Sequence, residues 1–172
     1  VEVALSWVKS HAFALQLTPT AEDNIMKNRS IHVHCPGGAV PKDGPSAGVT
    51  MVTAIVSALG NIPVKRDIAM TGEVSLRGKV IPIGGLREKS MAAYLAGVKR
   101  IFIPKDNARD IDKTDIAVRE NVEFVLCETV EDVIAGALII PEKITASEAS
   151  DSIIPIVSGK ASDNLNSGAV VR

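Results

Sequence analysis

Hydrophobic and polar positions form alternating blocks along the chain, and the period of these blocks changes from helical to strand-like. Apolar residues recur three and four positions apart from Val1 to Leu15, which predicts an amphipathic helix. A polar loop over residues 18–29 follows. The long apolar run over residues 49–59 predicts a buried helix, which the breaker Gly60-Asn61-Ile62-Pro63 ends.

Shorter apolar segments elsewhere predict strands, and they alternate with further helical segments. The expected strands cover residues 30–35, 67–74, 79–83, 100–104 and 122–126. The expected helices cover residues 88–95, part of 106–115, and 129–138, the last begun by Thr129 with Glu131 and Asp132 in its first turn. This order of elements predicts an α/β domain with a mixed sheet, of α+β type.

A turn ahead of the long apolar helix presents one serine in the run Pro41-Lys42-Asp43-Gly44-Pro45-Ser46-Ala47-Gly48. Gly44 and Gly48 let the backbone come close to a reacting group, and Pro45 stiffens the turn. Amides at a helix N-terminus favour negative charge, so an oxyanion beside Ser46 would be stabilised there. Taken alone, a serine at a helix start is more often an N-cap than a nucleophile.

A serine nucleophile needs an adjacent base, and the best candidate in this chain is Lys89. It lies in the run Gly84-Gly85-Leu86-Arg87-Glu88-Lys89-Ser90-Met91-Ala92-Ala93, a glycine turn that leads into a helix. If the helix packs Lys89 inward, burial favours a neutral amine, which can act as a general base. Serine with lysine is a known variant of the catalytic triad. Taken alone, a lysine on a helix is more often a solvated surface charge.

The histidines and cysteines do not form a recognisable site. His11 lies in the amphipathic N-terminal segment, while His32 and His34 share one face of the strand expected before the serine turn. Two histidines without a third ligand rarely bind a metal ion. Cys35 and Cys127 are isolated, which predicts neither a zinc site nor a disulfide framework and favours a reducing compartment.

Three motifs in this order resemble the proteolytic domain of the Lon proteases, specifically the LonA branch. They are the Pro-Lys-Asp-Gly-Pro-Ser-Ala-Gly run, the Met70-Thr71-Gly72-Glu73 segment and the Gly-Gly-Leu-Arg-Glu-Lys run. The spacing between Ser46 and Lys89 also fits the family pattern. The resemblance covers residues 1–138, which is most of the chain.

The resemblance implies an ATP-dependent serine endopeptidase with a Ser-Lys dyad. Ser46 would attack the peptide carbonyl, while Lys89 would remove its proton and later return one to the leaving amine. Thr71 matches the family threonine that hydrogen-bonds the lysine. Asp43 and Gly44 flank the nucleophile and are carried over as assisting residues, with amides of the turn forming the oxyanion hole.

The resemblance also implies the Lon proteolytic-domain fold, which is similar to the second domain of a ribosomal protein and to small-molecule kinases. The implied partners are unfolded or damaged polypeptides as substrates, identical chains in a hexameric ring, and an ATPase module of the same full-length chain. ATP and magnesium would belong to that module, and no cofactor or metal is expected in this chain. The implied compartment is the bacterial cytoplasm or an organelle matrix such as the mitochondrial one.

Family members have further strands ahead of the helix that begins here at Val1, so we expect the chain to start partway through the domain. Any targeting peptide would precede Val1. The expected proteolytic domain covers residues 1–143. Residues 144–172 are rich in serine, alanine, asparagine and aspartate, which predicts a mobile C-terminal tail.

Composition agrees with a soluble intracellular domain. The 172 residues, of which 46% are hydrophobic, suffice for one domain with its own core. The net charge of −1 and the scattered basic residues give little support for binding to nucleic acid or to an anionic membrane. No apolar run reaches the roughly 18 residues that indicate a membrane-spanning helix.

Alternative functions come from two glycine-containing segments and from the expected ring. A P-loop is excluded because the segment from Gly72 to Lys79 has one residue too many between its glycines, and Val80 follows the lysine. A small-molecule kinase of the related fold would use the glycine-serine turn to hold ATP phosphates, but it leaves the lysine run unexplained. An inactive or structural domain that builds a ring is the other alternative.

Overall fold

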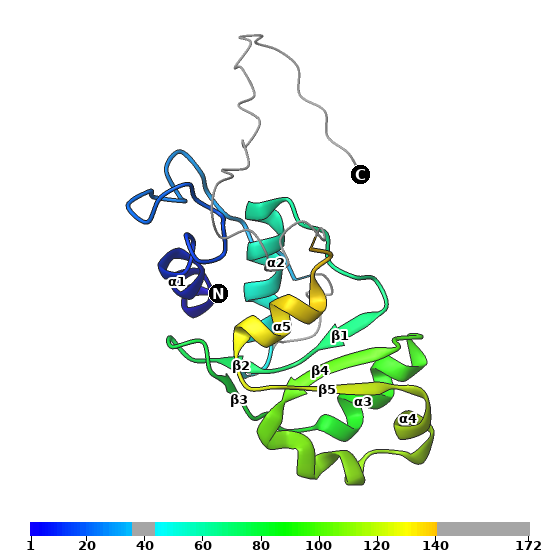
Figure 1. Ribbon diagram of the computed structural model, residues 1–172. Coiled ribbons are helices and arrows are strands. Elements are labelled where there is room, and N and C mark those ends of the chain that lie inside the picture. The colour runs from blue at the N-terminus through cyan, green and yellow to red at the C-terminus, as the bar shows by residue number, and fades with distance from the viewer. Residues whose placement is uncertain (36–43, 141–172) are drawn as a thin grey trace, which may run out of the picture. The chain divides into compact units, whose positions relative to one another are not determined.

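A three-stranded parallel sheet lies at the centre of the computed structural model, which describes residues 1–35 and 44–140 (Figure 1). Its strands are β1 (Ile68–Met70), β4 (Arg100–Pro104) and β5 (Glu123–Cys127), in the order β1-β4-β5. Phe102 of β4 is paired with Met70 on one side and with Val125 on the other. The central strand is therefore β4, and β1 lies at an edge of this sheet.

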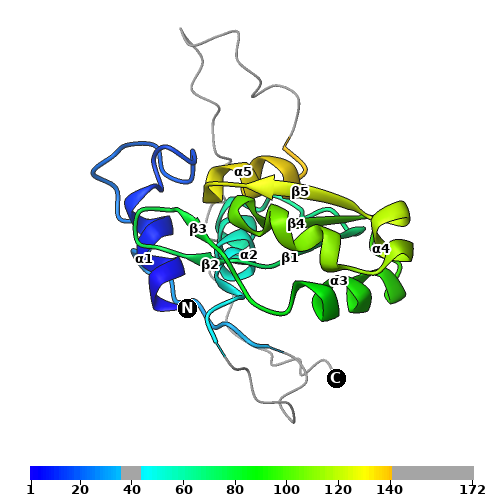
Figure 2. The same cartoon turned by 90° about the horizontal axis from the view of Figure 1, so that it is seen from below.

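Helices cover both faces of the sheet (Figures 1 and 2). One face carries α2 (Gly48–Gly60) and α5 (Val130–Ala137). The other face carries α3 (Leu86–Leu95), the 3-10 helix η1 (Lys105–Lys113) and α4 (Ile116–Asn121). A parallel sheet needs apolar cover on both faces, and these helices supply it. The parallel sheet with helices on both sides confirms the expected α/β class.

Successive side chains of β4 point to opposite faces and so belong to two separate hydrophobic cores. Phe102 packs into the α2 core, whereas Ile101 and Ile103 pack into the α3 core. The α2 core has the buried members Ala4, Trp7, Val8, Val49, Val52, Ile55, Val56, Val74, Val80, Phe102, Cys127, Val130, Val133, Ile134, Ala137 and Leu138. The smaller α3 core has the buried members Leu86, Ile101, Ile103, Val118 and Val122.

A short antiparallel hairpin and the N-terminal helix complete the α2 side. The hairpin consists of β2 (Glu73–Val74) and β3 (Val80–Ile81), and α1 (Glu2–Ser10) packs against α2. Gly78 in the hairpin turn has a φ of +78°, and a Cβ there would collide with Nε1 of Trp7. Glycine is required at 78 because the turn needs a left-handed backbone and the indole ring lies directly against it.

Several expected elements are confirmed, and others are wrong in extent or type. The helix over 49–59, the strands over 100–104 and 122–126 and the capped helix at Thr129 are present, with bounds shifted by a residue or two. The capping box is complete, because Thr129 and Asp132 each accept a backbone N–H of the other. The N-terminal helix ends at Ser10 rather than near Leu15, and turns follow it.

The strand expected over 30–35 is wrong, since residues 31–35 form no strand in the described part of the chain. Partly buried and exposed side chains alternate there, so the pattern reflects a half-covered surface segment rather than a paired strand. Both His32 and His34 are exposed. The strand expected over 67–74 divides into β1 and β2, which belong to different sheets, with Thr71 and Gly72 between them.

The expected partly helical segment 106–115 is the 3-10 helix η1, and the sequence analysis missed α4 directly after it. Asp115 caps α4 by accepting the N–H of Ala117 at 2.9 Å, a signal that the sequence contained. The expected domain end at residue 143 and the tail over 144–172 lie outside the described residues. Within the described ranges, none of the helices is both long enough and apolar enough to cross a membrane.

Candidate active site

Ser46 lies in the turn that leads into α2, where it is half-buried. The helix begins at Gly48 and Ala47 occupies its N-cap position, so Ser46 stands one residue ahead of the cap. Gly44, at the start of the described turn, has a φ of +80°, and no atom lies within 4 Å of the place where its Cβ would be. Ser46 is therefore not the N-cap of this helix.

Gly72 fixes the backbone of the serine turn from the other side. Its N–H donates to the Ser46 carbonyl at 2.9 Å, and its own carbonyl accepts the Val49 N–H at 3.1 Å. The Thr71 hydroxyl also donates to the Ser46 carbonyl, at 3.3 Å. A Cβ at position 72 would lie 2.8 Å from Cγ1 of Val80, so only glycine allows this approach.

The first two backbone N–H groups of α2 donate to carbonyl groups of the protein. The Gly48 N–H donates to the Pro45 carbonyl at 3.1 Å, and the Val49 N–H donates to Gly72. Both are therefore committed within the protein. An oxyanion site at this turn would have to use backbone amides that precede Gly48.

Lys89 lies on α3, on the opposite side of β1 from α2. The helix begins after Gly85, which has a left-handed backbone with a φ of +70°. Leu86 and Ser90 are the buried residues of this helix, and Lys89 lies between them in sequence and is exposed. The expected inward packing of Lys89 is therefore wrong: the helix turns Leu86 and Ser90 to the sheet and leaves the lysine at the rim.

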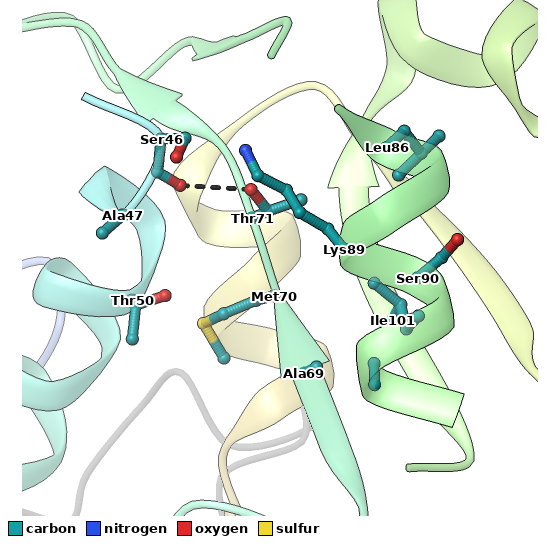
Figure 3. Close-up of a pocket in the computed structure, with 11 residues that line it drawn as sticks. Ser46, Ala47, Thr50, Ala69, Met70, Thr71, Leu86, Lys89, Ser90 and Ile101 are labelled. Carbon is teal, nitrogen blue, oxygen red and sulfur yellow. Dashed lines mark hydrogen bonds between the residues drawn. The ribbon is translucent and has the colours of Figure 1, made fainter. Parts of the chain in front are cut away.

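A pocket of about 220 Å³ brings the two candidate residues to one place. Figure 3 shows the Lys89 side chain extending from α3 toward Ser46 and Thr71. The pocket straddles the edge strand β1, with α2 on one side and α3 on the other. Its lining residues are Ser46, Ala47, Thr50, Ala69, Met70, Thr71, Leu86, Lys89, Ser90, Ala93 and Ile101.

Of the five residues predicted from sequence, the pocket lining includes Ser46, Lys89 and Thr71. Gly44 is exposed in the turn and does not line the pocket. Asp43 lies outside the described residues.

The sequence analysis missed the apolar walls of the pocket, among them Met70 and Ile101. It also missed Thr50, which lies in the first turn of α2, four residues after Ser46. In the described ranges, no three His, Cys, Asp or Glu residues are grouped so that they could hold a metal ion.

Comparison with known proteins identifies the family. Residues 1–140 match the Lon protease (S16) C-terminal proteolytic domain. The chain is 50% identical over 141 residues to "Lon protease 1" of Syntrophobacter fumaroxidans, an alignment that covers 82% of this chain and 17% of that protein. It is 44% identical over 172 residues to "Lon protease" of Azospirillum brasilense, covering 100% of this chain and 20% of the relative.

A plant relative gives the same result. "Lon protease homolog 2, peroxisomal" of Zea mays is 46% identical over 136 residues, which is 79% of this chain and 15% of that protein. The chain thus spans a fifth or less of the length of these relatives. The family match and the identities show that the chain belongs to the Lon protease family, in its C-terminal proteolytic domain.

Proposed function

We propose that this chain is a serine endopeptidase domain in which Ser46 is the nucleophile and Lys89 is the general base. The observation that carries the proposal is that both side chains line one pocket although they come from different helices on opposite sides of β1. Membership of the Lon protease family supports the same function.

In the proposed reaction, Oγ of Ser46 attacks the carbonyl carbon of the scissile peptide bond, and Nζ of Lys89 accepts the hydroxyl proton. The resulting tetrahedral oxyanion would be stabilised by amides of the turn ahead of Gly48. Lys89 then donates its proton to the leaving amine, and a water molecule hydrolyses the acyl-enzyme in the same way. Thr71 donates to the Ser46 carbonyl, and its oxygen can still accept a hydrogen bond from the Lys89 ammonium group.

The exposure of Lys89 gives the substrate a part in this mechanism. A general base must be neutral to accept a proton, and burial favours the neutral amine. A polypeptide bound over the pocket would cover the exposed Lys89 side chain beside Ser46. Asp43 and Gly44 would act as assisting residues, by fixing the turn that presents the serine.

The rest of the proposal concerns the full-length protein. Because the chain spans only 15–20% of the relatives' length, the remaining part would carry an ATPase module that binds ATP and magnesium. That module would deliver unfolded or damaged polypeptides to a hexamer of proteolytic domains. The chemistry at Ser46 and Lys89 itself requires no nucleotide, so peptide cleavage and ATP use can be tested separately.

The test is cleavage of a short fluorogenic peptide by the intact protein and by its variants. Ser46→Ala, Lys89→Ala and Lys89→Met are each expected to lower kcat/KM by about 10³-fold or more, because each removes a reacting group. Lys99→Ala is the matched control, since Lys99 is an exposed lysine just after α3 that does not line the pocket. Equal turnover by the parent protein and Ser46→Ala would refute the proposal and favour a structural, ring-forming role.

A further inference from the structure

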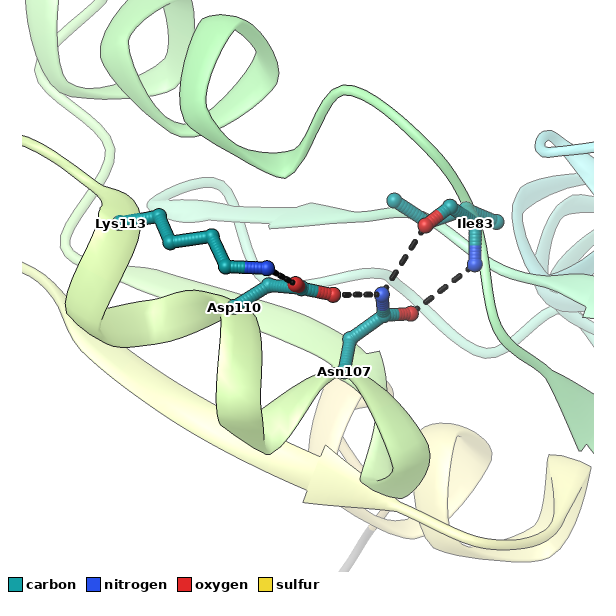
Figure 4. A network of polar contacts seen from close by, with 4 residues as sticks. All are labelled: Ile83, Asn107, Asp110 and Lys113. Atoms are coloured by element: carbon teal, nitrogen blue, oxygen red, sulfur yellow. Dashed lines mark hydrogen bonds and ion pairs between the residues drawn. The ribbon is translucent and has the colours of Figure 1, made fainter.

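The segment that leads into α3 is held by a side chain from η1. Asn107 is 2% exposed, and its amide group bonds both backbone groups of Ile83 (Figure 4). Oδ1 accepts the Ile83 N–H at 2.9 Å, and Nδ2 donates to the Ile83 carbonyl at 2.9 Å. Because β3 ends at Ile81, the Asn107 amide serves Ile83 in place of a strand partner.

A second pair of contacts fixes the orientation of this amide. Nδ2 of Asn107 also donates to Oδ2 of Asp110 at 2.8 Å, and Nζ of Lys113 donates to Oδ1 of the same carboxylate at 2.8 Å. Turning the amide by 180° would set its oxygen against the Asp110 carboxylate and its NH₂ against the Ile83 N–H. Only one orientation satisfies all the partners, so the contact is specific in direction as well as in place.

The position of Ile83 matters because two glycines separate it from α3. Gly85 has a φ of +70°, and Gly84 has no atom within 4 Å of the place where a Cβ would be. A glycine pair has the largest backbone freedom of any dipeptide. Here that freedom is limited from both ends, by Asn107 at Ile83 and by the buried side chain of Leu86.

Farther along the helix, the partly buried side chains of Met91, Ala93 and Tyr94 pack against the α3 core. Only Leu86 and Ser90 are buried in α3, and the Ser90 hydroxyl donates to the Arg87 carbonyl within the same helix. Lys89 lies less than one turn after Leu86. In the first turn of α3, Leu86 is the buried apolar side chain, and the bonds that Asn107 makes hold the segment ahead of it.

We propose that Asn107 is a positioning residue for Lys89, acting through Ile83 and the first turn of α3. This inference rests on the proposed function, because it assumes that the Lys89 amine takes the proton of Ser46. Without the two bonds to Ile83, the free segment would extend back to β3, and the first turn of α3 would gain freedom to move. A displacement of about 1 Å between reacting groups can cost about 100-fold in rate.

The test compares Asn107→Ala with a matched variant in the intact protein, using a fluorogenic peptide. Asn107→Ala is expected to lower kcat by about 10- to 100-fold with KM changed by less than about 2-fold, because the base is displaced and the substrate walls are not. Thr114→Ala is the control. Thr114 is also buried at the end of η1, but its hydroxyl donates to the Ile111 carbonyl and does not reach Ile83.

Two variants of Asp110 test the orientation of the Asn107 amide while the Asn107 side chain stays in place. Asp110→Asn keeps an oxygen that can accept from Asn107, so its kcat is expected within about 2-fold of the parent value. Asp110→Ala removes that acceptor, and its kcat should fall between those of Asp110→Asn and Asn107→Ala. If Asn107→Ala does not fold, this graded pair decides the question alone.

Hydrogen exchange gives a readout that does not depend on catalysis. The backbone amides of residues 83–90 should exchange faster in Asn107→Ala than in Thr114→Ala at equal global stability. A loss of kcat in Asn107→Ala no greater than in Thr114→Ala, while Lys89→Ala is inactive, would refute the positioning role alone. Normal cleavage by Lys89→Ala would overturn the proposed function and this inference together.

Discussion

The two sides of the pocket are held in place by different kinds of interaction. On the serine side, α2 buries Val49, Val52, Thr53, Ile55 and Val56. On the lysine side, α3 buries only Leu86 and Ser90, and the Asn107 amide holds the segment ahead of it. The serine turn thus rests on a large apolar core, whereas the lysine helix rests on a small one and a few directional bonds.

This difference predicts how each side responds to change. Apolar packing is spread over many contacts, so the loss of one contact leaves the others in place. A buried side-chain hydrogen bond is directional, and its loss leaves unpaired polar groups behind. We therefore expect stability to be concentrated on the serine side, and the alignment of Lys89 to be sensitive to single polar substitutions.

The largest effect is expected from a matched pair of glycine substitutions, one on each side. At Gly48 a Cβ would lie 2.7 Å from the backbone nitrogen of Val74, so Gly48→Ala must push β2 away from α2. At Gly84 a Cβ would meet nothing within 4 Å. Gly48→Ala is expected to lower the free energy of unfolding by about 3 kcal/mol, at the upper end for overpacking. Gly84→Ala should change it by less than about 1 kcal/mol.

Urea unfolding followed by circular dichroism measures both variants, and peptide cleavage adds a second test. Gly48→Ala should also lower the rate of peptide cleavage. The Gly48 N–H bonds the Pro45 carbonyl and the Val49 N–H bonds the Gly72 carbonyl, so a shift at residue 48 would displace the turn that holds Ser46. If the two variants are equally stable, α2 is not as closely packed against β2 as the distances indicate.

A smaller difference is expected between two valines that are both fully buried. Val52 lies in the α2 core and Val118 in the α3 core, and each is 0% exposed. Val52→Ala is expected to cost about 2 kcal/mol of unfolding free energy, because α2 is fixed between other helices and cannot move to fill the cavity. Val118→Ala should cost about 1 kcal/mol, since the short helix α4 can shift inward. Urea unfolding decides this, and a larger loss in Val118→Ala would reverse the comparison.

The sequence predicted the serine side better than the lysine side, because apolar packing leaves a pattern in the sequence and single hydrogen bonds do not. The helix α2 is predicted by one unbroken run of apolar residues. The glycines at 44 and 48 marked the turn ahead of it. The break between β1 and β2 was not predictable, because it depends on Gly72 bonding to the Ser46 turn, which lies far away in sequence.

On the lysine side, the motif around Lys89 located the helix but not the exposure of its lysine. The helix has a mixed pattern without a clear apolar face, so the sequence does not determine which side faces the sheet. The bonds from Asn107 to Ile83 span 24 positions of sequence, and no periodicity predicts them. Side-chain to backbone contacts of this kind can be known only from the folded structure.

The smallest expected effect is a loss of folding stability at high pH, which we expect to arise in the α2 core and not in the α3 core. Cys127 belongs to the α2 core and is 0% exposed. Burial raises the pKa of its thiol from 9.0 to about 11, and the Asp132 carboxylate adds to the shift. Because the folded state keeps the proton that the unfolded state releases, stability should fall as the pH rises from about 9 to about 11. The thiol contributes its full stabilisation below pH 9.

Cys127→Ala removes this titrating thiol from the α2 core. The free energy of unfolding, measured in urea at pH 8 and at pH 10.5, should therefore fall less in Cys127→Ala than in the parent protein. Val118→Ala serves as the control from the α3 core, and its pH dependence should match that of the parent. If the free energy of unfolding of Cys127→Ala falls as much between pH 8 and pH 10.5 as that of the parent protein, another group causes the loss of stability. The pH dependence would then not distinguish the two sides of the pocket.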